Sequence, residues 1–190
     1  LENGLVLASP AGGVPVGLAA AAHLGLPFDV VVVSKITLPW NTEAGYGAVA
    51  FDGTCQLNRA LIAHLSLSED QITEGIRKTR SKVMRRVERF RGNRPFPELT
   101  GRPVILVDDG LASGFTMRTA IAALRKAGAD TLIVAVPTAH DRAVADIAGL
   151  AEGVVCANIR PGGRFAVAEA YQDWYDVSEA EVLLALKSSP

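Results

Sequence analysis

The sequence has 190 residues, and its 19 basic and 20 acidic side chains leave a formal net charge of −1. A chain so close to neutral has no overall field that would attract nucleic acid or an anionic membrane, so its charge points to neither partner. Because 49% of the residues are hydrophobic and only 6% are aromatic, the composition favours a tightly packed α/β domain over an all-β sandwich. The length suits a single domain.

Cys55 and Cys156 lie far apart, in no spacing typical of a metal site. We therefore expect two reduced thiols in a cytoplasmic protein. Residues 3–28 carry no Lys, Arg, Asp or Glu, but prolines and glycines interrupt this run and no basic segment precedes it. We expect neither a signal peptide nor a membrane span there. The sequence does not begin with Met, which predicts that a short N-terminal piece is missing.

Apolar runs bounded by turn residues predict strands that alternate with helices. Buried strands are expected at 5–9, 28–35, 102–108, 131–137 and 153–159. Helices are expected at 16–25, 69–90, 116–128 and 141–150. A β-hairpin is expected at 46–58, with Asp52 and Gly53 at its turn. The pattern predicts an α/β fold, an open and mostly parallel sheet flanked by helices, with a β-hairpin insertion.

Ligands of such sheets bind beyond the carboxyl ends of the strands. Three of the expected strand ends are unusual: the loop 10–15, the pair Ser34 and Lys35, and the stretch 108–116. We expect these three segments to converge on one crevice. For Lys35 alone, a surface lysine is an equally good interpretation.

Residues 110–116, GLASGFT, lie between an expected strand and an expected helix. Small residues let a ligand approach the backbone, and a helix N-terminus offers unpaired N–H groups and a positive dipole end. Ser113 and Thr116 add hydroxyl donors. This pattern predicts a phosphate-binding loop, although it has neither the P-loop spacing nor the GxGxxG spacing of dinucleotide-binding proteins.

Asp108 and Asp109 directly precede this loop. Carboxylates in direct contact with a phosphate would repel it, so they fit better on the hydroxyl groups of a sugar or near a Mg²⁺ ion. A turn that caps the helix is the alternative. The loop 10–15 offers consecutive backbone N–H groups that suit a second anion, or else forms an ordinary tight turn.

The stretch VILVDDGLASGFT, residues 104–116, resembles the signature of type I phosphoribosyltransferases: a hydrophobic strand, two acidic residues and a small-residue loop that ends in Thr or Ser. Nearly the whole chain resembles a bacterial group of phosphoribosyltransferases whose acceptor is undefined. The segments that carry this second resemblance are GGVPVG (12–17), SKI (34–36), EAGYGAVAFDG (43–53) and YQDWYDVSEAEV (171–182).

The resemblance implies a Mg²⁺-dependent transfer from 5-phosphoribosyl-1-pyrophosphate (PRPP), in which a nucleophile attacks C1 of the ribose and pyrophosphate leaves. Asp108 and Asp109 would bind the ribose hydroxyls and lie near the Mg²⁺, through the ribose or through water. With Lys35 they would be the catalytic residues. Carboxylates there would stabilise an oxocarbenium-like transition state, and Mg²⁺ would offset charge on the pyrophosphate. The 5′-phosphate would lie on residues 112–116, namely Ala112, Ser113, Gly114, Phe115 and Thr116, and Gly110 would also bind the substrate. The pyrophosphate would lie on Ala11, Gly12 and Gly13, often with a non-proline cis peptide.

By the same resemblance, residues 1–190 form one domain, with a core at about 1–160 and a small hood from 161–190 that covers the acceptor. A nucleobase or related small molecule is the implied acceptor, and a cytoplasmic homodimer that acts in nucleotide metabolism is the implied context. If the chain start is truncated, part of the hood is missing.

Two residues depart from the family pattern. Ala11 stands where the related group usually has arginine, which weakens the pyrophosphate site. Ala112 stands where enzymes for 6-oxopurines have an aspartate, which argues against hypoxanthine and guanine.

Residues 77–94 hold nine of the 19 basic residues and leave three interpretations open. They are a solvated helical face, a lid that brings cations to the pyrophosphate, or a nucleic-acid surface. We do not expect nucleic-acid binding. The alternative to an enzyme is a non-catalytic PRPP-binding regulator of the same fold that contacts nucleic acid through this segment. A hydrolase with Asp108 as nucleophile is less favoured, because such enzymes need a DxD spacing that DDG lacks.

Overall fold

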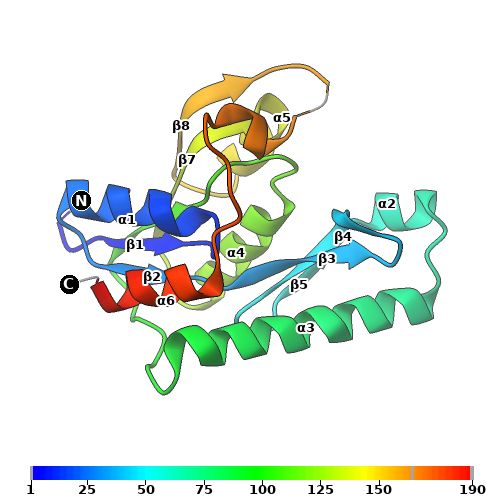
Figure 1. Ribbon diagram of the computed structural model, residues 1–190, viewed down its shortest axis with the longest axis horizontal. Coiled ribbons are helices and arrows are strands. Elements are labelled where there is room, and N and C mark those ends of the chain that lie inside the picture. Colours follow the sequence, from blue (N-terminus) through cyan, green and yellow to red (C-terminus); the bar gives the residue numbers. More distant parts are fainter. Residues whose placement is uncertain (1, 164, 189–190) are drawn as a thin grey trace.

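The computed structural model describes residues 2–163 and 165–188 (Figure 1). Within them, a parallel sheet of five strands has the order β2-β1-β6-β7-β8, and a separate antiparallel sheet has the order β3-β4-β5. The first sheet consists of β1 Leu5–Ala8, β2 Phe28–Val30, β6 Pro103–Val107, β7 Thr131–His140 and β8 Gly153–Arg160. The second consists of β3 Val33–Leu38, β4 Asn41–Ala50 and β5 Cys55–Leu57. The predicted α/β fold with a parallel sheet is confirmed.

Helices cover both faces of the parallel sheet. Their bounds are α1 Gly13–Leu24, α2 Arg59–His64, α3 Glu69–Arg91, α4 Phe115–Lys126, α5 Asp141–Ala148 and α6 Glu179–Ser188, with a 3₁₀ turn η1 at Val167–Ala170. Alternate residues of the central strand β1 point to opposite faces. Leu5 and Leu7 belong to the core under α4 and α5, whereas Val6 and Ala8 belong to the core under α1 and α6. None of these helices is long and apolar enough to cross a membrane.

The single strand predicted at 28–35 is wrong. Phe28, Asp29 and Val30 pair with β1, and the chain then crosses into the second sheet, where β3 begins at Val33. The run Val30, Val31, Val32 and Val33 is at most 4% exposed. An unbroken apolar run shows that a segment is buried, but not that it stays in one sheet. Lys35 therefore belongs to the antiparallel sheet and does not end a strand of the parallel one.

The hairpin predicted at 46–58 is confirmed, with Asp52 and Gly53 at the turn between β4 and β5. Gly53 has φ of 84°, the left-handed conformation that favours glycine at such a turn. The hairpin is part of a larger unit, since β3 adds a third strand.

Two expected elements differ at their ends or in their burial. Helix α1 begins at Gly13 rather than Val16, because Pro15 falls in the first turn, where a backbone N–H has no intrahelical partner to lose. Strand β8, expected to be buried, is instead the edge of the sheet, and Val155 and Ile159 are 62% and 51% exposed. The expected free thiols are confirmed, since neither cysteine forms a disulfide.

The helix predicted at 69–90 is confirmed as α3, which begins with a capping box between Ser68 and Gln71. Its basic side chains are not uniformly solvated. Arg86 and Arg89 form ion pairs with Glu179 of α6 at 3.2 and 3.1 Å. This half of α3 is therefore tied to the C-terminal helix (Figure 1).

Arg91 is the buried member of the basic segment. Its guanidinium lies 2.8 Å from the Asp29 carboxylate and donates to the carbonyls of Val30 and Pro95. It also lies over the ring of Phe96, 4.6 Å from the centroid. One side chain thus joins α3, the end of β2 and the loop before β6.

Replacing Arg91 with methionine is expected to destabilise the fold by roughly 3–5 kcal/mol, because it leaves the Asp29 carboxylate buried without its partner. Urea unfolding measures the difference. Arg77→Ala is the matched control, since Arg77 is exposed and pairs with Glu74 on the same helix face. That control should stay within about 0.5 kcal/mol of the wild type. Equal losses in the two variants would show that the buried ion pair does not stabilise the fold.

Candidate active site

Strands β1 and β6 are parallel neighbours in register, so their carboxyl ends lie side by side. Ala8 pairs with Val107, and the N–H of Ser9 donates to the Val107 carbonyl at 2.9 Å. The loop after β1 and the loop after β6 therefore begin at the same point. This brings together two of the three segments that were predicted to converge.

The two loops touch through glycines. A Cβ atom on Gly12 would overlap the carboxylate of Asp109, and one on Gly13 would lie 2.9 Å from the Asp108 Cα and from the Val107 carbonyl oxygen. Only residues without a side chain allow this approach. The expected non-proline cis peptide is present between Pro10 and Ala11. The backbone of the loop after β1 is thus pressed against the acidic pair.

A cavity of about 440 Å³ opens above this contact. One wall is formed by Leu111 and Val167 and by most of the predicted site residues, namely Asp108, Asp109, Gly110, Ala112, Ser113, Gly114, Phe115 and Thr116. The opposite wall comes from the antiparallel sheet and consists of Lys35, Ala44, Gly45 and Gly47. Lys35 therefore reaches the site from a different sheet than predicted. Ala11, Gly12 and Gly13, which were predicted to bind the pyrophosphate, do not line this cavity. Gly12 and Gly13 instead lie against Asp109 and Asp108.

The loop 110–114 is held in place by the neighbouring strand β7. The N–H of Leu111 donates to the Thr138 carbonyl at 3.0 Å, and the N–H of His140 donates to the Leu111 carbonyl at 2.8 Å. Gly114 then takes the left-handed conformation with φ of 68° as α4 begins. The first turn of α4 lies at the cavity wall, where the Phe115 N–H donates to the Ser113 hydroxyl at 3.4 Å and the helix end carries a partial positive charge.

Burial and mutual repulsion make the acidic pair costly in the ligand-free protein. Burial raises the pKa of Asp108 well above its usual value, the Asp109 carboxylate raises it further, and hydrogen bonds from the Asp109 N–H and the Ser9 side chain partly oppose this. Burial also raises the pKa of Asp109. Hydrogen-bond donors or a cation supplied by a ligand would relieve this cost.

Tyr171 belongs to the site, although no role for it follows from the sequence. Its hydroxyl donates to the Asp109 carbonyl at 2.7 Å, and burial together with the two carboxylates raises the pKa of Tyr171 to about 12. Its ring meets that of Trp174 edge-on, with centroids 5.1 Å apart. The stretch 171–182 carries a family pattern, but local sequence does not show that it returns to the end of β6.

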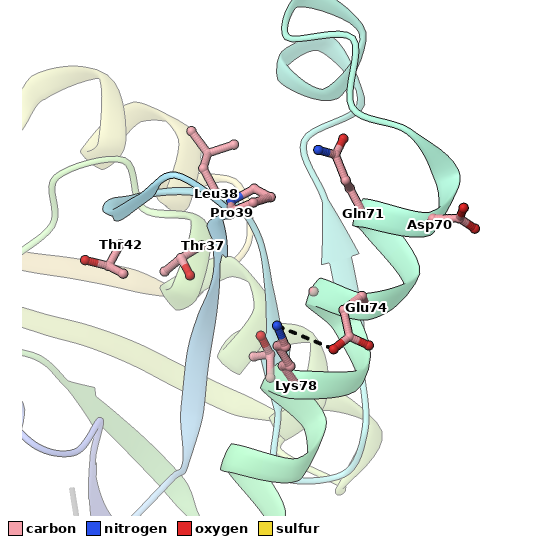
Figure 2. Close-up of a pocket in the computed structure, with 10 residues that line it drawn as sticks. Thr37, Leu38, Pro39, Thr42, Asp70, Gln71, Glu74 and Lys78 are labelled. Carbon is pink, nitrogen blue, oxygen red and sulfur yellow. Dashed lines mark ion pairs between the residues drawn. The ribbon is translucent and has the colours of Figure 1, made fainter.

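A second cavity of about 490 Å³ lies between the β3–β4 turn and α3 (Figure 2). Figure 2 shows Lys78 and Glu74 pointing toward each other, 3.4 Å apart. Hydrogen bonds from Arg77 and Lys78 lower the pKa of Glu74 to about 2. Two carboxylates, Asp70 and Glu74, and one cation, Lys78, line this cavity, so it does not resemble a site for a phosphate.

The comparison with known proteins decides the family. Residues 2–161 match the family model of the phosphoribosyl transferase domain. The chain belongs to the phosphoribosyl transferase family. The resemblance seen in residues 104–116 is thereby confirmed.

Relatives within this family share most of the length of the chain. The crystal structure of TT1426 from Thermus thermophilus is 34% identical, covers 98% of this chain and 88% of its own, and has a TM-score of 0.76. A protein of Mycobacterium tuberculosis, whose name assigns it provisionally to the phosphoribosyl transferases, is 39% identical over 182 residues. That alignment covers 96% of this chain but 41% of the relative, so the chain spans about two fifths of that protein's length. The orotate phosphoribosyltransferase of Streptomyces coelicolor is 30% identical over 131 residues, 63% of this chain and 71% of its own.

Asp108→Asn is expected to stabilise the ligand-free phosphoribosyl transferase, and the gain should grow as the pH rises above about 4. The folded state holds the Asp108 proton more tightly than the unfolded state does, so ionisation of this carboxyl costs folding free energy once the pH exceeds the unfolded pKa. Below that pKa both states are protonated and the two proteins should be equally stable. Thermal unfolding between about pH 3.5 and 8 measures this, with about 2–4 °C expected per kcal/mol. Asp146→Asn, at an exposed carboxylate, is the control. An Asp108→Asn gain that is the same at every pH would contradict the account.

Proposed function

We propose that this chain catalyses transfer of the 5-phosphoribosyl group of PRPP to a nucleobase or a related planar acceptor, with release of pyrophosphate. The observation that carries the proposal is the cavity at the ends of β1 and β6. There a buried acidic pair lies between a glycine loop and a small-residue loop that begins a helix. PRPP is a ribose with a phosphate at one end and a pyrophosphate at the other. It fits a site in which two loops that suit anions lie on either side of two carboxylates that accept hydrogen bonds from hydroxyl groups.

In this proposal the loop 112–116 and the first turn of α4 bind the 5′-phosphate. The Asp108 and Asp109 carboxylates accept hydrogen bonds from the ribose hydroxyls, and the loop 11–13 lies beside the pyrophosphate. The C1–oxygen bond to pyrophosphate breaks as a bond from an acceptor nitrogen to C1 forms, and the acceptor loses its proton to solvent. Positive charge that develops on the ribose in the transition state is stabilised by the nearby carboxylates.

Magnesium is part of the proposal as an ion that the substrate brings. Within residues 2–163 and 165–188, no cluster of three or more His, Cys, Asp or Glu side chains could hold a metal ion. The two carboxylates at the cavity floor supply part of the oxygen ligand set that Mg²⁺ prefers, and substrate oxygens and water would supply the rest. Bound there, the ion would offset the charge of the pyrophosphate.

The acceptor would lie under the C-terminal segment. A small cavity of about 90 Å³ is lined by Gly12 and Asp109 and by the aromatic residues Tyr171, Trp174 and Tyr175. Trp174 and Tyr175 are 42% and 58% exposed, so they have ring surface to offer a ligand. Aromatic rings beside the reacting centre suit a flat heterocycle. This segment is our candidate for the predicted hood.

A screen for pyrophosphate release tests the function, with PRPP, Mg²⁺ and a panel of nucleobases. We expect release that depends on one class of acceptor, and we expect Asp108→Asn combined with Asp109→Asn to lower the rate by about 10²–10³, because the charge that stabilises the transition state is removed. The matched control is Asp146→Asn, at an exposed carboxylate of α5. Binding of PRPP without turnover on any acceptor would favour the non-catalytic regulator instead.

A further inference from the structure

The C-terminal segment anchors the loop after β6 through Tyr171. The hydroxyl of Tyr171 donates to the Asp109 carbonyl oxygen at 2.7 Å, across 62 residues of sequence. Strand β6 ends at Val107, and the hydrogen bonds that hold the loop on β7 start at Leu111. Tyr171 therefore supplies an anchor in the span between these two points, where the acidic pair lies.

A second contact from the same segment lies beside the first. A Cβ atom on Gly110 would lie 2.8 Å from a methyl carbon of Val167 and 3.1 Å from the side chain of Thr138. The 3₁₀ turn η1 thus packs directly on the Gly110 backbone, while Tyr171 holds the carbonyl of Asp109. Together the two contacts confine the peptide group that joins Asp109 to Gly110.

The orientation of this peptide group affects the Asp109 carboxylate. The carbonyl and the N–H of a planar trans peptide group point in opposite directions. When Tyr171 holds the carbonyl, the Gly110 N–H is directed away from Tyr171, and this N–H is one of the groups that hydrogen-bond to the Asp109 carboxyl group. One rigid group of atoms therefore connects the Tyr171 hydroxyl to the Asp109 side chain.

Tyr171 is well suited to be a permanent donor. Burial raises its pKa to about 12, with further contributions from the Asp109 and Asp108 carboxylates, so the hydroxyl keeps its proton at neutral pH. Its ring also packs edge-on against Trp174, with centroids 5.1 Å apart. Phenylalanine at this position would keep the ring contact and remove only the donor.

We propose that Tyr171 is a positioning residue for the ribose, whose hydroxyl holds the Asp109–Gly110 peptide group so that the Asp109 carboxylate stays turned toward the sugar hydroxyls. The inference rests on the proposed function, in which this carboxylate accepts hydrogen bonds from the ribose. Without the Tyr171 hydroxyl the peptide group can rotate, and the carboxylate leaves the orientation that the ribose needs. Contacts with the 5′-phosphate do not depend on this bond.

Two ligands separate a role in holding the ribose from a role in holding the chain. They are ribose 5-phosphate and tetrahydrofurfuryl phosphate, which keeps the ring and the phosphate but has no hydroxyl groups on the ring. Each is titrated into the whole chain, and the chemical shifts of the protein in NMR spectra give the dissociation constants. The ratio of the two constants measures how much the ribose hydroxyls contribute to binding.

We expect Tyr171→Phe to lower this ratio by about 3- to 10-fold, the worth of one hydrogen bond. The affinity for tetrahydrofurfuryl phosphate should stay within about twofold of the wild type, because its contacts do not involve Asp109. A variant that merely loosened the fold would weaken both ligands equally and leave the ratio unchanged.

Ser178→Ala is the matched control in the same segment. The Ser178 hydroxyl accepts from the Glu181 N–H at 3.3 Å, and the Ser178 N–H donates to the Glu181 carboxylate at 2.8 Å. Removing this hydroxyl weakens the cap of α6 without removing a contact to Asp109, so the ratio should not change.

The outcomes distinguish the inference from the proposed function. If the wild type prefers ribose 5-phosphate and Tyr171→Phe keeps that preference in full, the inference is wrong while the proposed function stands. If the wild type binds both ligands equally well, or binds neither, the acidic pair does not hold a ribose and both are wrong.

Discussion

The contact between the glycine loop and the acidic pair is the constraint on which the rest of this structure depends. Parallel pairing of β1 with β6 places the two strand ends together, and glycines at positions 12 and 13 let the backbone lie against Asp108 and Asp109. A side chain at either position would push the two loops apart. The cavity, the anchoring of the loop 110–114 by β7 and the path of the C-terminal segment are all arranged around this contact.

The acidic pair costs the ligand-free protein stability, and this cost points to function. Burial raises the pKa of both carboxyl groups, and the pair has hydrogen bonds that offset the cost only in part. A fold selected for stability alone would have amide or apolar side chains there. Carboxylates that destabilise the ligand-free fold, but that sugar hydroxyls and a cation would stabilise, are typical of a ligand site.

Much of the fold and of the site was predictable from sequence, because it is encoded locally. The stretch 104–116 contains the strand, the acidic pair, the loop and the helix start, and the structure places all of them as predicted. The predictions that failed concern residues whose contacts are made with residues distant in sequence. The valines at 30–33 are buried whether they stay in one sheet or join two, so the crossing into β3 left no local signal. Tyr171 reaches the site only through the return of the C-terminal segment, which no local pattern reveals.

The most direct test of this account is the structure of crystals soaked with PRPP. We predict that the 5′-phosphate lies on the loop 112–116 and that the ribose hydroxyl oxygens lie within about 3 Å of the Asp108 and Asp109 carboxylate oxygens. The pyrophosphate should then lie beside Gly12, on the side of Lys35. Density for the ligand in the cavity between α3 and the β3–β4 turn, with the acidic pair unoccupied, would contradict the account.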